Sequence, residues 1–278
     1  MASTLPLAAV PPAPAESAGA RLKQRLAENR AALRERYLDR NSAPELLREH
    51  RKLVDNTLIS AWQAVAMPAA AALIAVGGYG RGQLFPCSDI DLLLLLPRAA
   101  DAATAEKLEQ FVSLAWDIGL DVGHSVRTVA ECMELAAQDI TIQTSLLEAR
   151  LVAGERKLFR QLEKEFRRQL DPVPFTEAKR LEQEQRHVRY HDTNLEPNIK
   201  ETAGGLRDLQ TILWISKAAG IGTRWSDLVT RDVITRREAA LLRRHEAFLQ
   251  NLRIRLHYLA RRREERLVFD VQTALAAQ

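Results

Sequence analysis

Apolar residues recur at helical spacing over two early segments, Arg21 to Leu38 and Pro44 to Met67, and this periodicity predicts two helices before the first strand. The apolar run that follows, Ala71 to Val76, leads straight into Gly77-Gly78 and predicts a strand that ends in a turn. A second run, Leu92 to Leu96, is apolar at every position. Such continuity is typical of a strand buried on both faces, so we place this segment in the core of a sheet.

The next segments alternate between helix and strand signals. Asp101 can cap an amphipathic helix, and Leu120 to Arg127 follows it as a strand. The pair Thr128 and Glu131 has the spacing of a capping box, which predicts another helix. The order strand, turn, strand, helix, strand predicts a mixed α+β domain. The last signals before residue 170 predict a short strand and a charged helix, over Glu148 to Val152 and Glu155 to Gln169.

The sequence Asp171-Pro172-Val173-Pro174 is the best internal boundary, because two prolines in four residues stop a helix and stiffen an extended connection. After it we expect only helices, over Glu177 to His191, Leu206 to Ala219 and Arg236 to about Arg263. The first twenty residues are rich in Ala and Pro and aperiodic, which predicts a disordered tail. The expected organisation is a tail (1–20), a sheet domain (21–170) and an all-α domain (171–278).

Composition narrows the class of protein. The chain has 278 residues, 46% of them apolar, which is enough for one large or two ordinary domains with real cores. No window approaches about eighteen uninterrupted apolar residues, and the N-terminus lacks a basic start, so we expect neither a membrane span nor a signal peptide. The two cysteines, Cys87 and Cys132, have no metal-ligand spacing, which favours a reducing, cytoplasmic location.

Charge restricts the partners further. Residues 220–278 hold twelve arginines against seven acidic residues, while the whole chain carries a net charge of +4. Arginines mixed with glutamates on predicted helices are typical of a solvated helix face. We therefore do not expect nucleic acid as a partner.

Two aspartates at the mouth of the leucine run carry the first chemical signal. Residues i and i+2 of a strand point to the same face about 6.6 Å apart, so Asp89 and Asp91 project side by side while Ile90 faces the other way. Two unpaired carboxylates at that distance repel each other, and a divalent cation removes the penalty. Mg²⁺ is usually held by one or two carboxylates together with substrate phosphates, so the spacing favours a site for Mg²⁺ and a nucleotide.

The preceding turn supplies a complementary signal for phosphate. Gly77 and Gly78 leave no side chain between backbone N–H groups and an approaching anion. Arg81 adds a bidentate phosphate donor, and Ser88 is placed to donate to a phosphate or to orient a carboxylate. A lone GG or a lone DxD is usually a plain turn, but the two together in an α/β pattern are far more specific.

This organisation resembles the polymerase-beta-like nucleotidyltransferase superfamily, in which an apolar strand, a glycine pair and an Asp-x-Asp strand follow one another. Four stretches carry a closer resemblance, to the N-terminal nucleotidyltransferase part of the bifunctional uridylyltransferase/uridylyl-removing enzymes. They are VGGYGRGQLFPCSDIDLLLL, DVGHSVRTVAEC, DITIQTSLLEARLVAG and EPNIKETAGGLRDLQTI. The likeness runs from about Leu22 to Phe269, so it implies a polymerase-beta-like sheet with flanking helices, followed by a helical domain.

The resemblance also implies an activity. Members of that family transfer UMP from UTP to a tyrosine of the nitrogen-signalling protein PII and release pyrophosphate, with two Mg²⁺ ions held by the Asp-x-Asp carboxylates. The family continues into an HD phosphohydrolase domain and two ACT domains, and no such sequence follows Phe269. We therefore expect this chain to lack uridylyl-removing activity and glutamine sensing.

A third carboxylate on a neighbouring strand normally completes such a site. We expect it to be Asp121, on the strand beside Ile90 to Leu96, with Glu148 as the rival; a salt bridge to Arg127 or Arg150 is the plainer interpretation of either. His124 follows Asp121 by three residues, but a histidine on a strand is more often a packing residue than a base.

The loop NLEPNIKETAGGLRD is rich in polar residues and enters a helix after two glycines. Lys200 and Arg207 in this loop are candidate partners of the triphosphate. Two alternatives remain open at this point. One is a nucleotidyltransferase that uses another NTP or acceptor, including RNA, and the other is a fragment that binds nucleotide or PII without turnover.

Overall fold

The computed structural model describes residues 18–191 and 195–277. Of the tail expected over residues 1–20, residues 1–17 lie outside this description. The expectation was wrong for the remainder, because Ala18 already begins helix α1 (Ala18–Arg40). Within residues 18–191 and 195–277, no helix is long and apolar enough to cross a membrane.

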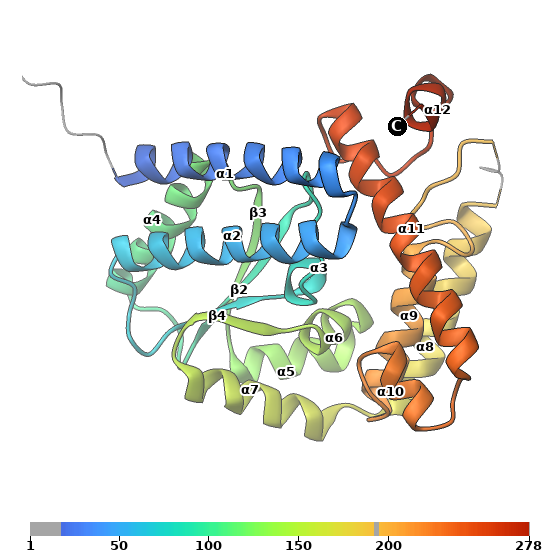
Figure 1. The fold of residues 1–278 in the computed structure, drawn as a ribbon. Coiled ribbons are helices and arrows are strands. Elements are labelled where there is room, and N and C mark those ends of the chain that lie inside the picture. The colour runs from blue at the N-terminus through green and yellow to red at the C-terminus, as the bar shows by residue number, and fades with distance from the viewer. Residues whose placement is uncertain (1–17, 192–194, 278) are drawn as a thin grey trace, which may run out of the picture.

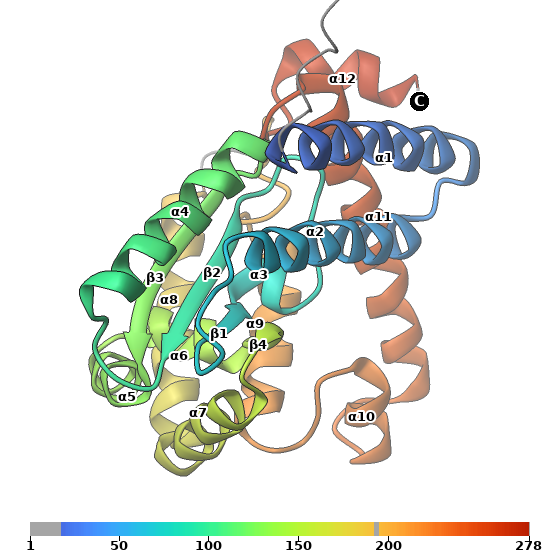
Figure 2. The same cartoon turned by 90° about the vertical axis from the view of Figure 1, so that its left-hand side faces the viewer.

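A four-stranded sheet with the order β3-β2-β1-β4 forms the centre of the first half of the chain (Figures 1 and 2). The inner strands β1 (Ala72–Ala75) and β2 (Ile90–Leu96) are antiparallel, and every position of the leucine run is buried, as predicted. The edge strand β3 (Val122–Thr128) pairs parallel to β2, and β4 (Arg150–Gly154) pairs antiparallel to β1. The α+β class expected from the sequence, a small sheet with flanking helices, is confirmed.

Alternate residues of the two inner strands serve two separate cores. Leu92, Leu94 and Leu96 pack with residues of three helices, α1, α2 (Ala43–Ala64) and α4 (Ala102–Ile118). Leu93 and Leu95 pack on the opposite face, where α5 (Val129–Gln138), α6 (Ile140–Leu147) and α7 (Arg156–Gln169) lie. Because side chains alternate along a strand, Asp91 shares the face of Leu93 and Leu95. The carboxylates therefore face α6 and not α4.

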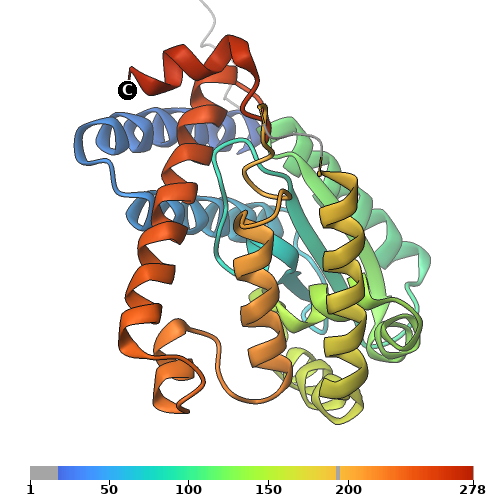
Figure 3. The same cartoon turned by 90° about the vertical axis from the view of Figure 1, so that its right-hand side faces the viewer.

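The second half of the chain is helical in all the elements that the structure describes. It contains α8 (Pro172–Arg189), α9 (Leu206–Ala218), α10 (Trp225–Thr230), α11 (Arg236–Ala260) and α12 (Phe269–Ala276). Helices α8, α9 and α11 stand side by side next to the sheet (Figure 3). Helix α6 contacts both α8 and α9, so these helices close over the face that carries Asp91.

Two local predictions from the sequence were wrong, and some helices were missed. Pro172 and Pro174 do not form an extended connection but lie in the first turn of α8, and Asp171 caps that turn by accepting the N–H of Val173 at 3.0 Å. Proline is tolerated there because the first N–H groups of a helix have no partner within it. Strand β4 begins at Arg150, since Glu148 still belongs to the end of α6. Helices α6, α10 and α12 were not predicted.

Candidate active site

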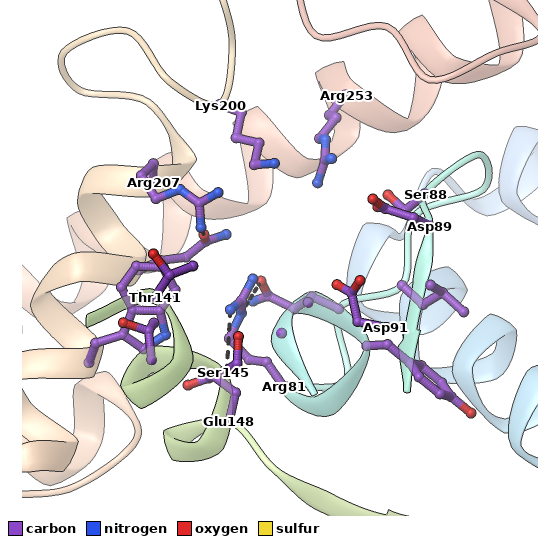
Figure 4. Close-up of a pocket in the computed structure, with 18 of the residues that line it drawn as sticks. Arg81, Ser88, Asp89, Asp91, Thr141, Ser145, Glu148, Lys200, Arg207 and Arg253 are labelled. Atoms are coloured by element: carbon purple, nitrogen blue, oxygen red, sulfur yellow. Dashed lines mark hydrogen bonds and ion pairs between the residues drawn. The ribbon is translucent and has the colours of Figure 1, made fainter. Parts of the chain in front are cut away.

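A cavity of about 260 Å³ lies between the Asp91 face of the sheet and helices α6, α8, α9 and α11 (Figure 4). Every site residue predicted from the sequence except Asp121 lines it: Gly77, Gly78, Arg81, Ser88, Asp89, Asp91, Lys200 and Arg207. Gly77 and Arg207, which are 130 positions apart in the sequence, thus line the same cavity.

The two carboxylates lie at one side of this cavity, at the start of β2. Burial raises the pKa of Asp91 above its ordinary value, and the neighbouring charge of Asp89 raises it further. Asp89 accepts a contact from Arg263, with 2.8 Å between Oδ2 and Nη1. Both partners are about half exposed, at 49% and 57% of the side chain, so this ion pair is weak and open to competition by a cation.

The glycine turn α3 (Gly77–Gly80) fits tightly against this carboxylate. Gly77 has φ +57°, and a Cβ added to it would lie 2.9 Å from Oδ2 of Asp91. Gly80 is more tightly constrained, because its Cβ would meet the backbone carbonyl oxygen of Glu148 at 2.3 Å. Both positions therefore require glycine for steric reasons, beyond any approach of a phosphate.

A buried brace that the sequence did not reveal holds the turn in place. Tyr79, inside the turn, donates a hydrogen bond to Asp55 of α2. Arg150 of β4 binds the same carboxylate with both terminal nitrogens, at 2.9 and 3.0 Å. Burial and Asp55 raise the pKa of Tyr79, so the phenol keeps its proton and remains a donor. The three residues come from separate elements, so their spacing carries no local signal.

Helix α11 is attached to the segment just before Asp89. The N–H of Cys87 donates to Nδ1 of His257 at 3.3 Å, and His257 is fully buried. Burial lowers the pKa of His257 to about 3, so the ring is neutral and Nδ1 accepts. The segment around Asp89 is thus tied to α11 through His257 and to the segment that follows α11 through Arg263.

The two candidates for a third carboxylate have different surroundings. Glu148 is buried, lines the cavity and binds Arg81 with 3.3 Å between Oε2 and Nη1, a partner that the sequence did not predict. Asp121 is exposed and does not line the cavity. Its carbonyl oxygen accepts the N–H of Ile90 at 2.8 Å, and the pairing of Ile90 with Val122 places Asp121 beside Asp89 on the same face.

The neighbours of Asp121 on β3 clarify this edge of the sheet. Gly123 pairs with Asp91, and a Cβ there would lie 3.3 Å from Oδ1 of Asp91, so glycine leaves this carboxylate room. His124 pairs with Leu92 and therefore faces the opposite side, where its ring lies 6.3 Å from that of Trp116. A role for His124 at the cavity does not fit this orientation.

The loop before α9 brings cations to the other side of the cavity. The side chain of Asn198 accepts the N–H groups of Lys200 and Glu201 at 3.0 and 2.8 Å, which fixes the loop. Burial lowers the pKa of Lys200, and the nearby charges of Arg207 and Arg253 lower it further. Several positive groups therefore crowd one wall of the cavity, opposite the two aspartates (Figure 4).

The carboxylate side suits a hard divalent cation. Mg²⁺ prefers carboxylate oxygens, and Asp89 and Asp91 present them on one face. Burial and the charge of Asp89 raise the pKa of Asp91, and a bound cation would offset both effects. Within residues 18–191 and 195–277, no group of three His, Cys, Asp or Glu side chains is placed to hold a metal. Asp89 and Asp91 would supply two carboxylates to a metal. Its remaining ligands would have to be substrate oxygens, or the Asp121 carboxylate after a rotation of that side chain.

Comparisons with known proteins agree with this architecture. Residues 60–147 match the family "Nucleotidyltransferase domain", and residues 174–278 match the family "GlnD PII-uridylyltransferase". Proteins named bifunctional uridylyltransferase/uridylyl-removing enzyme are similar over most of the chain. That of Nitrosospira multiformis is 54% identical over 92% of this chain, and that of Cupriavidus pinatubonensis is 50% identical over 99%.

The chain spans about a third of the length of these relatives, 30% and 32% respectively. A crystal structure of a toxin-antitoxin with AMP-PNP is a weaker match, with 16% identity over 50% of this chain and 97% of the other. The TM-score of that match is 0.28.

Proposed function

We propose that this chain transfers UMP from UTP to a tyrosine of PII in the presence of Mg²⁺. The chain is a nucleotidyltransferase, and it belongs to the PII-uridylyltransferase family over residues 174–278. Similar proteins are named bifunctional uridylyltransferase/uridylyl-removing enzyme. The residues to which we assign metal and triphosphate binding line the cavity. UTP, PII and Mg²⁺ are all part of this proposal.

The opposition of charge across the cavity is the observation that carries the proposal. On one side, burial and Asp89 raise the pKa of Asp91. On the other side, burial and neighbouring arginines lower the pKa of Lys200. Each set of like charges is destabilised by its own members, and a metal-bound triphosphate relieves both, since it presents a cation to the carboxylates and an anion to the cations.

The residues divide the work along this axis. Asp89 and Asp91 would hold Mg²⁺, which when bound neutralises charge on the triphosphate and polarises the α-phosphorus for attack. Lys200 and Arg207 would bind the triphosphate, while Gly77 and the adjoining Gly78 leave room for its oxygens. The bond from the tyrosine oxygen to the α-phosphorus forms as the α–β bridge breaks, and pyrophosphate leaves.

The phenolic proton needs an acceptor in this reaction, and we assign it to Asp121. The sheet register places Asp121 beside Asp89 at the open edge strand, where its side chain is exposed. Glu148 is less suitable, because it is buried and already bound to Arg81. Asp121→Asn is therefore expected to lower transfer with little effect on melting, while Glu148→Gln lowers the melting temperature.

Pyrophosphate release tests the proposal directly. With UTP, Mg²⁺ and PII, the chain should release pyrophosphate and label PII, and Asp89→Asn or Asp91→Asn should reduce the rate by several orders of magnitude without unfolding. Asp117→Asn, on the exposed side of α4, is the matched control and should retain the rate. Near-normal turnover of either site variant at saturating Mg²⁺ would refute the site.

The same assay separates the alternatives. Preferential use of ATP, or labelling of RNA and not of PII, identifies a transferase of different specificity. Binding of UTP with Mg²⁺ but no release of pyrophosphate identifies a fragment that retains the nucleotide site alone.

A further inference from the structure

The end of the cavity away from the carboxylates is built from helices α6, α8 and α9. Arg207, Gln210 and Trp214 of α9 follow one another at intervals of three and four, so they lie on the same face of the helix, and all three line the cavity. Thr141 and Ser145 of α6 face the same space (Figure 4). Besides the guanidinium of Arg207, this wall carries neutral polar groups, and Lys179 and Glu182 of α8 add one charge of each sign.

Gln210 has a fixed orientation in this wall. Its side chain is nearly buried, with 4% of the residue exposed, and its Oε1 accepts Nη1 of Arg207 at 3.2 Å. Arg207 is itself held, because Nε and Nη2 contact the carboxylate of Glu201 at 3.4 and 3.2 Å. An arginine only donates, so the amide oxygen must face it and the NH₂ group must point away.

The NH₂ group of Gln210 is therefore a hydrogen-bond donor with a fixed orientation. Among residues 18–191 and 195–277, Nε2 of Gln210 makes no hydrogen bond, and the residue lines the cavity. Nε2 keeps some accessible surface and so opens to the cavity, where a ligand that supplies an acceptor gains a hydrogen bond in a largely buried site.

We propose that Gln210 reads the O4 carbonyl of a uracil base and excludes cytosine. The inference rests on the proposed function, which brings a nucleoside triphosphate into the cavity with its phosphates between the carboxylates and the cations. At ring position 4, uracil presents a carbonyl acceptor, whereas cytosine presents an amino donor. Cytosine would set its NH₂ against the NH₂ of Gln210, and neither donor would be satisfied.

Equilibrium binding of UTP and CTP to the full 278-residue chain, each with Mg²⁺ and without acceptor protein, tests this assignment. The unchanged chain should bind UTP about 10- to 100-fold more tightly than CTP. Gln210→Met keeps the length of the side chain but removes the donor, and should bring the two affinities within about threefold. Gln210→Glu replaces the donor by an acceptor and should shift the preference toward CTP.

Gln250→Met is the matched control. Gln250 is a glutamine of similar burial, at 6% exposure, and its NH₂ donates to Glu246 at 3.3 Å outside the cavity. The ratio of UTP to CTP affinity should not change in this variant.

The outcomes separate this inference from the proposed function. An equal loss of affinity for UTP and CTP in Gln210→Met would overturn the inference, because it would make Gln210 a phosphate or ribose contact. A ratio near one in the unchanged chain would overturn it as well. Failure of the proposed function is read from pyrophosphate release with PII, which this binding ratio does not use.

Discussion

Gly77 and Asp91 share one small volume at the heart of the cavity, since a Cβ on Gly77 would lie 2.9 Å from Oδ2 of Asp91. The turn and the carboxylate belong to neighbouring strands, and Val76 donates its N–H to the carbonyl oxygen of Asp91 at 3.0 Å. The sheet therefore holds the two backbones together, and a side chain at Gly77 would have to displace the Asp91 carboxylate.

Gly77→Ala should for this reason damage activity more than stability. The φ of +57° adds strain of about 1 to 2 kcal/mol for alanine, and the methyl group displaces Asp91. A misplacement of about 1 Å can cost about 100-fold in rate, so the smaller shift needed here is expected to cost about 10-fold in transfer rate. Gly119→Ala is the control, because Gly119 has φ +92° with no atom within 4 Å of the added Cβ. It should lose stability similarly and keep its rate, and equal rates in both variants would contradict the steric argument.

Asp91→Asn should raise the melting temperature of the metal-free protein at pH 8, by about 1 to 3 °C. The pKa of Asp91 is raised in the folded state by burial and by Asp89, so the folded chain holds this proton more readily than the unfolded chain does. Stability from this group is thus present at low pH and lost as the pH rises through the folded pKa. The gain in the variant should shrink as the pH is lowered.

Thermal melts from pH 5 to pH 8 check this, first with EDTA and then with Mg²⁺. Mg²⁺ should stabilise the unchanged chain and leave Asp91→Asn nearly unaffected. A lower melting temperature of the variant at pH 8 in EDTA would mean that the carboxylate stabilises the metal-free fold.

Asp55→Asn should destabilise the protein, although Asp55 does not line the cavity. It removes the charge that Arg150 and Tyr79 share, with side chains of Asp55 and Arg150 only 16% and 26% exposed. A loss of about 1 to 3 kcal/mol is expected, with a lower transfer rate because the glycine turn loses its brace. In Glu163→Gln, which breaks an exposed pair with Arg167, the loss should be below about 0.5 kcal/mol. Urea denaturation measures both.

Arg263→Gln should tighten the binding of Mg²⁺ in the absence of nucleotide, by about two- to fivefold at low salt. The guanidinium now contacts Asp89 at 2.8 Å and competes with a cation for that oxygen. The neighbouring Arg262 pairs with Glu264 instead, so Arg262→Gln should leave the affinity unchanged. Calorimetric titration with MgCl₂ compares the two, and equal affinities at low salt would show that Arg263 does not compete.

Local patterns were sufficient to predict much of this molecule. The leucine run gave a buried strand, and the alternation along it put Asp89 and Asp91 on one face, because both features depend only on neighbours in sequence. Loop residues as distant as Lys200 were predicted to bind phosphate, and the structure brings them into the same cavity.

Contacts between distant elements were beyond such patterns. Asp55, Tyr79 and Arg150 meet only after α2, the glycine turn and β4 have packed, and Arg263 reaches Asp89 across 174 positions. Gln210 gave no sequence signal either, since its orientation depends on Arg207 and Glu201. The prediction of an extended connection after Asp171 was wrong for a different reason. Proline is tolerated both in a stiff connection and in the first turn of a helix, so its presence does not distinguish the two.

The cavity takes its acidic side from the sheet and most of its basic side from the helices after Pro172. A protease cut between Gln169 and Pro172 would leave every one of these side chains intact and still divide the site between two pieces. Activity would then require the two fragments to associate, and mixing them at rising concentration would restore it.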